Sequence, residues 1–283
     1  MSARSPVVVG HDGHALGPLR AGEALARALG LPLVLGCAYH YEPVVVGPGA
    51  TGDDRSAPRA LRAEATLDAA RRLVHVADVD CRVLPADGAA ESLRQLAAEV
   101  DAAAVVVGPD LRGEVTREVL GHAHCPVVVA PAEALVVAPQ VRVVGVAYDG
   151  SVASRFALSA AACVAAAAGA TLRILAATGR RPTSRCADDL GRAAAQVPGA
   201  TVPVETRVLH GRAAAELRRA CEDLDLLACG SRGHGRLLGA LLGSVSTPLV
   251  DDPVCPVLVV PPIVRRRGHQ PLGLSTAGTE QLV

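Results

Sequence analysis

The residues with the clearest chemical potential lie in a glycine-rich segment in the second half of the sequence. Gly230 and Gly233 are followed, after nine further residues, by Gly243, Ser244 and Val245. Glycines let backbone amides approach phosphate oxygens closely, and serine hydroxyls add further donors. The segment follows a short apolar run and precedes a helical pattern, which is typical of a phosphate cradle. A merely flexible loop is the alternative interpretation.

This segment matches neither of two widespread phosphate-binding motifs. A Walker loop needs a lysine after its glycines, and the sequence contains no lysine. The dinucleotide fingerprint belongs after the first strand of its unit, where this chain has Asp149-Gly150-Ser151 instead. The glycines therefore indicate a phosphate site of another type.

Asp149 is the second candidate for a ligand contact. It follows an apolar run, which places it at the carboxyl edge of a parallel sheet, where open α/β folds bind ligands. The competing interpretation is structural, because Asp149 or Ser151 could cap the helix that the next residues predict. In a sheet of order 3-2-1-4-5, the first and fourth strands are neighbours. Asp149 and the glycine segment would then border one crevice.

Three landmarks occur twice in the same order, which predicts two copies of one domain. They are an Asp-Gly pair after an apolar run, an Arg-Val-Leu triplet and a Cys-Pro-Val triplet. The pairs begin at Asp12 and Asp149, Arg82 and Arg207, and Cys125 and Cys255.

Short apolar runs alternate with helical patterns within each copy, which predicts βαβ units and a parallel sheet. We therefore expect an α/β fold of two tandem doubly wound domains, each a five-stranded parallel sheet of order 3-2-1-4-5 flanked by helices. In copy two the strands are expected near 141–148, 171–177, 203–208, 224–229 and 256–261, and the helices at 152–168, 184–196, 211–222 and 244–251. The expected domains are 1–135 and 140–262, followed by a disordered tail at 263–283.

The glycine spacing resembles the phosphate-binding signature of the ATP-binding universal stress proteins. The flanking runs at 225–230 and 255–260 fit this family too, and the resemblance covers about residues 1–261 as two family domains. It implies a stress-response or regulatory protein that binds ATP, with Mg²⁺, and has no strong catalytic activity.

In that family the first-strand aspartate lies near the ribose, the second-strand backbone meets the adenine and the glycine loop wraps the triphosphate. Carried over by position, the resemblance assigns nucleotide contacts to Asp149, roughly Ala177, Gly230, Gly233, Gly243, Ser244 and Val245, and Arg232 in the same loop is a further candidate from its charge. Arg232 can pair with phosphate oxygens or face water. The sequence predicts no catalytic residue and no metal ligand.

Copy one departs from this signature. From the loop glycine to the next Cys-Pro pair it has 17 positions, where copy two has 25, and it lacks the Gly-x-x-Gly spacing. Its shortened segment carries acidic residues that would repel a triphosphate; these are Asp110, Glu114 and Glu118. Asp12 is present, but we expect the copy-one site to be lost or strongly altered. The first domain would thus have a degenerate phosphate loop, and the second an intact ATP motif.

Composition excludes several classes of partner. Arginines balance the acidic residues at 28 each, and there are one Phe, three Tyr and no Trp. A nucleic-acid partner is therefore not expected. The uncharged stretch 156–172 is too weak for a membrane span. Eight cysteines form no CxxC pair or zinc spacing, so we expect a cytoplasmic protein with reduced thiols. His122, His124 and Cys125 could bind a metal, although such a cluster is more often incidental.

The resemblance also implies how the copies meet. Members of the family commonly dimerise through their last strands, so 126–130 and 256–260 would pair as an intrachain pseudo-dimer, with a homodimer left open. Two rival functions stand beside ATP binding: an ATP-cleaving enzyme of the adenine-nucleotide α-hydrolase-like superfamily, and a ligand-free scaffold that acts through protein contacts.

Overall fold

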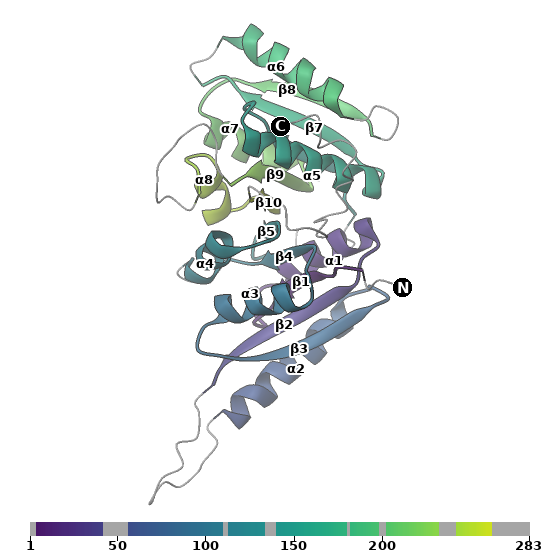
Figure 1. Cartoon of the computed structure of the whole chain (residues 1–283), viewed down its shortest axis with the longest axis vertical. Helices are drawn as coiled ribbons and strands as arrows, with labels where there is room; N and C mark the ends of the chain where they lie inside the picture. The colour runs from purple at the N-terminus through teal and green to yellow at the C-terminus, as the bar shows by residue number, and fades with distance from the viewer. Residues whose placement is uncertain are drawn as a thin grey trace, which may run out of the picture.

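A computed structural model gives the structure of the chain (Figure 1). It describes residues 4–41, 56–109, 113–133, 140–179, 182–197, 202–231 and 242–261. The expected tail at 263–283 and the domain limits at 135 and 262 lie outside these ranges.

The first half alternates strands and helices. Its inner strands are rich in valine and leucine and largely buried, as parallel strands covered on both faces must be. Its elements are β1 (Val7–Gly10), α1 (Gly17–Leu29), β2 (Leu33–His40), α2 (Ala57–Leu73), β3 (Val79–Ala86), α3 (Ala89–Glu99), β4 (Ala104–Val107), α4 (Glu114–His122) and β5 (Val127–Val129).

The second half repeats this order, with bounds within two residues of those predicted. The helix expected at 211–222 ends instead in a 3₁₀ turn, a common way to tighten a helix C-terminus. The elements are β6 (Val143–Ala147), α5 (Val152–Ala168), β7 (Thr171–Ala177), α6 (Thr183–Gln196), β8 (Val204–Leu209), α7 (Ala213–Ala220), the 3₁₀ turn η1 (Cys221–Asp223), β9 (Leu226–Gly230), α8 (Ser246–Asp251) and β10 (Val257–Val260).

The described strands form one continuous sheet, in the order β3-β2-β1-β4-β5-β10-β9-β6-β7-β8. Each half has the predicted order 3-2-1-4-5. The halves meet in the middle of the elongated molecule (Figure 1), where β5 and β10 pair antiparallel and Val128 lies opposite Leu258. The predicted pairing of the last strands as an intrachain pseudo-dimer is confirmed.

Each face of the sheet has a hydrophobic core that contains residues of both halves. Val7 and Val9 of β1 belong to one core, together with residues of α1, α2, α5 and α6. Val8 belongs to the other, with residues of α3, α4, α7 and α8. This division follows from the alternation of side chains along a strand. The two domains are thus packed as one body.

Candidate functional site

The carboxyl ends of β6 and β9 lie side by side where the strand order of the second domain reverses. β9 pairs with β6, with Ala228 opposite Val146, and β7 pairs with the other side of β6. Asp149 follows β6 and Gly230 ends β9. The structure therefore brings these two candidates to the edge where open α/β sheets bind ligands, as the sequence predicted.

Asp149 shapes the turn that leads into α5. Its Oδ1 accepts a hydrogen bond from the Ser151 amide at 2.9 Å, an arrangement typical of an Asx turn. Ser151 is the helix cap, since its Oγ accepts from the Ser154 amide at 3.2 Å. Of the two residues proposed as caps, Ser151 therefore takes that role.

Ala177 ends β7, beside β6 in the sheet. It pairs with Leu209 of β8, whose carbonyl then accepts from the Thr178 amide at 2.8 Å. Ala177 is half-buried and Thr178 is buried. Ala177 thus lies at the same sheet edge as Asp149, while its contact with adenine stays a prediction.

Gly230 has a packing role that sequence reasoning missed. A Cβ at this position would lie 2.6 Å from the Ala153 Cβ and 2.9 Å from the Ala153 carbonyl oxygen, because the first turn of α5 packs against the end of β9. Gly108 has the same role in the first domain, where a Cβ would lie 2.6 Å from Pro18 Cγ. Close approach of helix and strand therefore explains both glycines without any ligand.

Hydrogen bonds close the stem of the glycine loop. The Gly243 amide lies 3.0 Å from both the Ser231 carbonyl oxygen and the Ser246 Oγ. The Gly243 carbonyl accepts from Thr247, at 3.0 Å from its amide and 2.9 Å from its Oγ1. Both backbone polar groups of Gly243 are thus engaged within the protein. The Gly243 amide and carbonyl therefore hold the stem of the loop rather than face a ligand.

Two of the remaining candidates lie in the turn before α8. Ser244 is exposed and Val245 is half-buried, and residues at the start of a helix have amides without an intrahelical partner. Arg232 and Gly233, also assigned to the nucleotide, lie outside the described residues.

Ser231 is a residue of this edge that the sequence analysis did not select. It follows Gly230 and is buried, and its Oγ has no hydrogen-bond partner within the part of the chain that the structure describes. Buried hydroxyls are nearly always paired, because an unmade hydrogen bond costs roughly 1–3 kcal/mol. A ligand oxygen at this edge would satisfy it. Its position directly after the fourth strand was the available sequence signal.

The equivalent edge of the first domain contains a small cleft. Asp12 there makes the same turn as Asp149, with its Oδ1 2.9 Å from the His14 amide. The cleft has a volume of about 130 Å³ and lies between the ends of β1 and β4 and residues of α1, α3 and α4. Pockets for drug-sized ligands usually measure about 300–1,000 Å³, so this cleft is small for a nucleotide.

His11 and Tyr148 occupy equivalent positions after β1 and β6, and both are buried. Burial lowers the pKa of the His11 imidazole, against an opposing effect of Asp12. Burial also raises the pKa of the Tyr148 hydroxyl. Both side chains are therefore mainly neutral at pH 7, and neither adds positive charge for a phosphate.

Other functional groups are sparse in the described ranges. No three His, Cys, Asp or Glu side chains converge there as metal ligands. The eight cysteines are free, and burial raises the pKa of Cys125 and Cys229 to about 12. No helix in these ranges has the length and apolar character to cross a membrane.

Comparison with known proteins agrees with this fold. The profile of the Universal stress protein family matches residues 140–261. The second domain therefore belongs to the universal stress protein family. A universal stress protein of Mycobacterium tuberculosis (strain H37Rv) is 35% identical over 83 residues, which are 29% of this chain and 26% of that protein. The match thus spans about a quarter of that curated relative's length.

Solved universal stress proteins extend the likeness to both domains. One from Archaeoglobus fulgidus has a TM-score of 0.70 at 19% identity and covers 91% of this chain and 97% of that chain. This likeness concerns the fold. Another from Archaeoglobus fulgidus, solved in complex with dAMP, is 26% identical with a TM-score of 0.33 and covers 44% and 97% of the two chains.

Proposed function

We propose that this universal stress protein binds ATP at the carboxyl edge of its second domain and acts in stress regulation without strong catalytic activity. The observation that carries the proposal is the buried Ser231 Oγ, which lacks a partner within the described residues and lies between β9 and the glycine loop. A phosphate oxygen is a strong acceptor for such a hydroxyl.

The other candidate residues at this edge would contact the ribose, the adenine and the phosphates as the family signature implies. Asp149 would accept from a ribose hydroxyl while its Oδ1 holds the turn. The backbone at Ala177 would meet the adenine. Ser244, Val245 and Arg232 would contact the phosphates, within a loop whose stem Gly243 closes.

Mg²⁺ would enter with the nucleotide. Because Mg²⁺ in nucleotide sites is held by phosphate oxygens, waters and only one or two carboxylates, the proposal needs no preformed metal cluster. The ion would offset phosphate charge at an edge where Arg232 is the one positively charged candidate.

The first domain would not bind ATP. Its cleft of about 130 Å³ and its shortened, acidic loop segment support this assignment. ATP would then act as an occupant of the second domain, and ligands that bind only the folded state stabilise it by mass action. The cytoplasmic location and a possible homodimer stay predictions of the sequence.

The test combines Ser231→Ala with calorimetry. We expect one ATP per wild-type chain. Ser231→Ala should reduce ATP affinity about tenfold, yet leave stability without nucleotide unchanged or slightly higher, because it removes an unpaired buried hydroxyl.

Ser246→Ala is the matched control, since the Ser246 Oγ supports the loop stem through the Gly243 amide. It should lower both stability and affinity. Two equivalent ATP sites per chain, or a Ser231→Ala variant with unchanged affinity, would contradict the assignment. Mass spectrometry of small molecules released from protein purified from cells distinguishes a ligand-free scaffold, and a turnover assay with ATP and Mg²⁺ distinguishes a hydrolase.

A further inference from the structure

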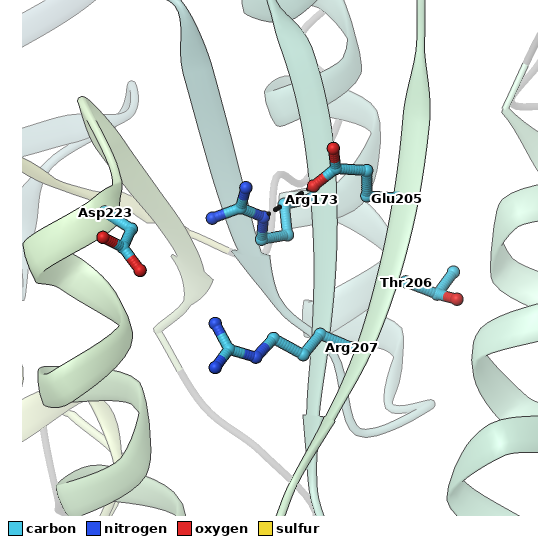
Figure 2. Close-up of a pocket in the computed structure, with 5 residues that line it drawn as sticks. All are labelled: Arg173, Glu205, Thr206, Arg207 and Asp223. Atoms are coloured by element: carbon cyan, nitrogen blue, oxygen red, sulfur yellow. Dashed lines mark hydrogen bonds and ion pairs between the residues drawn. The ribbon is translucent and has the colours of Figure 1, made fainter.

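A second pocket of the second domain has a volume of about 500 Å³ and is open to solvent (Figure 2). Arg173 of β7 lies four residues before Ala177, so the pocket stands roughly 13 Å back from the proposed nucleotide edge. The lining residues are Arg173, Glu205, Thr206, Arg207 and Asp223.

The charged side chains of the pocket converge from two strands and from η1. Figure 2 shows the guanidinium groups of Arg173 and Arg207 extending toward the side where Asp223 lies, whereas Thr206 points away. Arg173 Nε donates to Glu205 Oε2 at 2.9 Å. Arg207 and Asp223 make no ion pair at 4.0 Å or less with any described residue. Both residues are exposed to solvent, so this pocket holds two opposite charges that have no ion-pair partner among the described residues.

The first domain shows how these charges are otherwise satisfied. Arg82 corresponds to Arg207 and forms ion pairs with Asp80 at 2.6 Å and Glu99 at 3.9 Å. Asp80 lies opposite Val34 in the sheet, and Val34 is buried in the hydrophobic core. In the first domain, Arg82 therefore pairs with both Asp80 and Glu99.

Arg173 changes this arrangement in the second domain. It stands where the first domain has Val34, because it lies opposite Glu205 as Val34 lies opposite Asp80. The Arg173 guanidinium pairs with Glu205, which stands where the first domain has Asp80. Arg207 therefore does not pair with the carboxylate at this position. Duplication thus gives an internal comparison: the arginine at this position is ion-paired in the first domain, and in the second it is exposed without an ion-pair partner among the described residues.

We propose that this pocket binds a small zwitterion of the free α-amino acid class. Its two arginines and two acids give a lining of zero formal charge, which does not favour a ligand with a large net charge. A ligand carboxylate can bind a guanidinium in a bidentate manner, here Arg207. A ligand ammonium group would pair with Asp223. The volume lies within the usual range for small-molecule sites.

Arg173 and Glu205 have different roles in this site. The ion pair fixes Arg173 beside the ligand carboxylate, and Glu205 compensates the charge that a second arginine adds. The site is separate from the proposed ATP site, and the proposal does not depend on nucleotide binding.

The first experiment uses the full chain and the proteinogenic L-amino acids, added one at a time. Ligands of the folded state raise the melting temperature, and calorimetry then gives the dissociation constant. We expect at least one amino acid to bind. Its N-acetyl derivative lacks the ammonium group and its amide lacks the carboxylate, so each should bind about tenfold or more weakly.

The second experiment tests the two unpaired residues. Arg207→Gln and Asp223→Asn should each reduce affinity for that amino acid about 10- to 100-fold. Arg82→Gln, the matched change in the first domain, should leave the affinity unchanged. Circular dichroism checks folding, and ATP titration of the same variants reports separately on the nucleotide site.

Three results would overturn the proposal. One is that no amino acid raises the melting temperature or gives a calorimetric signal. Another is that the N-acetyl derivative binds as well as the amino acid, which would make the pocket a simple anion site. The third is that Asp223→Asn leaves affinity unchanged or increases it.

Discussion

Arg117 of α4 and Asp251 at the end of α8 form an ion pair of 2.9 Å between the two domains. Asp251 belongs to the helix that directly follows the glycine loop, so the pair connects the second domain with the first. Both side chains are partly exposed, and solvent screening makes such pairs weak. The paired strands β5 and β10 and the shared cores therefore carry most of the domain contact.

Removing this ion pair should have a small effect. Arg117→Ala and Asp251→Ala should each lower the free energy of unfolding by about 0.2–1 kcal/mol, and the double variant should lose less than their sum. Chemical denaturation of the four proteins of the cycle measures the coupling. A loss well above about 2 kcal/mol from either change would show that the junction depends on the pair.

Asp149→Ala should weaken ATP binding more than Asp12→Ala. The two aspartates make the same turn at 2.9 Å, so both variants lose this hydrogen bond, and the proposed ribose contact is lost in Asp149→Ala alone. Loss of a ribose contact to a charged acceptor should reduce affinity about 5- to 150-fold. Titration with fluorescent ATP and melting without nucleotide are compared for both variants. A larger effect of Asp12→Ala would place the working site in the first domain.

Gly230→Ala should destabilise the fold. Its Cβ would lie 2.6 Å from Ala153 Cβ and 2.9 Å from a backbone oxygen, and overpacking of this kind costs about 1–3 kcal/mol. Gly108→Ala is the matched control and should cost a similar amount, since its Cβ meets Pro18 at 2.6 Å. Thermal melting of the two variants measures both effects, and wild-type stability in either would disprove the packing role.

Gly233→Asp should instead abolish ATP binding and leave the fold intact, because a carboxylate in the loop repels the triphosphate. Gly243→Asp should abolish binding as well. The stem hydrogen bonds of Gly243 are made by its backbone, which aspartate retains. Circular dichroism and ATP titration separate folding from binding. Unchanged affinity in both variants would remove the glycine loop from the site.

Acidification should destabilise the protein partly through His11. Burial lowers the pKa of His11 in the folded state below its ordinary value of 6.5, with Asp12 opposing and His14 adding to the shift. The unfolded chain therefore takes up a proton first, and the His11 contribution to stability is present above pH 6.5 and is lost as pH falls below it. Melting temperatures from about pH 7.5 to about pH 5.5 should fall more for wild type than for His11→Gln. Parallel curves would contradict this.

The sequence predicts the secondary-structure elements and the internal repeat well. Alternating apolar runs place the elements of the second domain within two residues, and the repeated landmarks predict two sheets of the same order. The joining of β5 to β10 came from the family resemblance, because no local pattern specifies which strands meet across domains.

Contacts between distant residues were harder to foresee. The packing of Gly230 on Ala153 joins positions 77 residues apart, so the glycine suggested a ligand before the helix was visible. Neither the Ser231 hydroxyl nor the Arg207 and Asp223 charges have a hydrogen-bond or ion-pair partner, respectively, in the described part of the chain, and this depends on which residues surround them in the fold. A missing hydrogen-bond or ion-pair partner can be recognised only in the folded structure, where the neighbours of each side chain are known.

The antiparallel pairing of β5 with β10 inside one polypeptide also has an evolutionary consequence. In a symmetric assembly of identical subunits, each mutation appears twice, so a change that closes or opens a site does so in every copy. Here the halves are inherited together but vary independently. Val34 in one half and Arg173 in the other are an example of that freedom. Fusion of the two halves thus allows a division of labour that a homodimer of one gene product could not acquire.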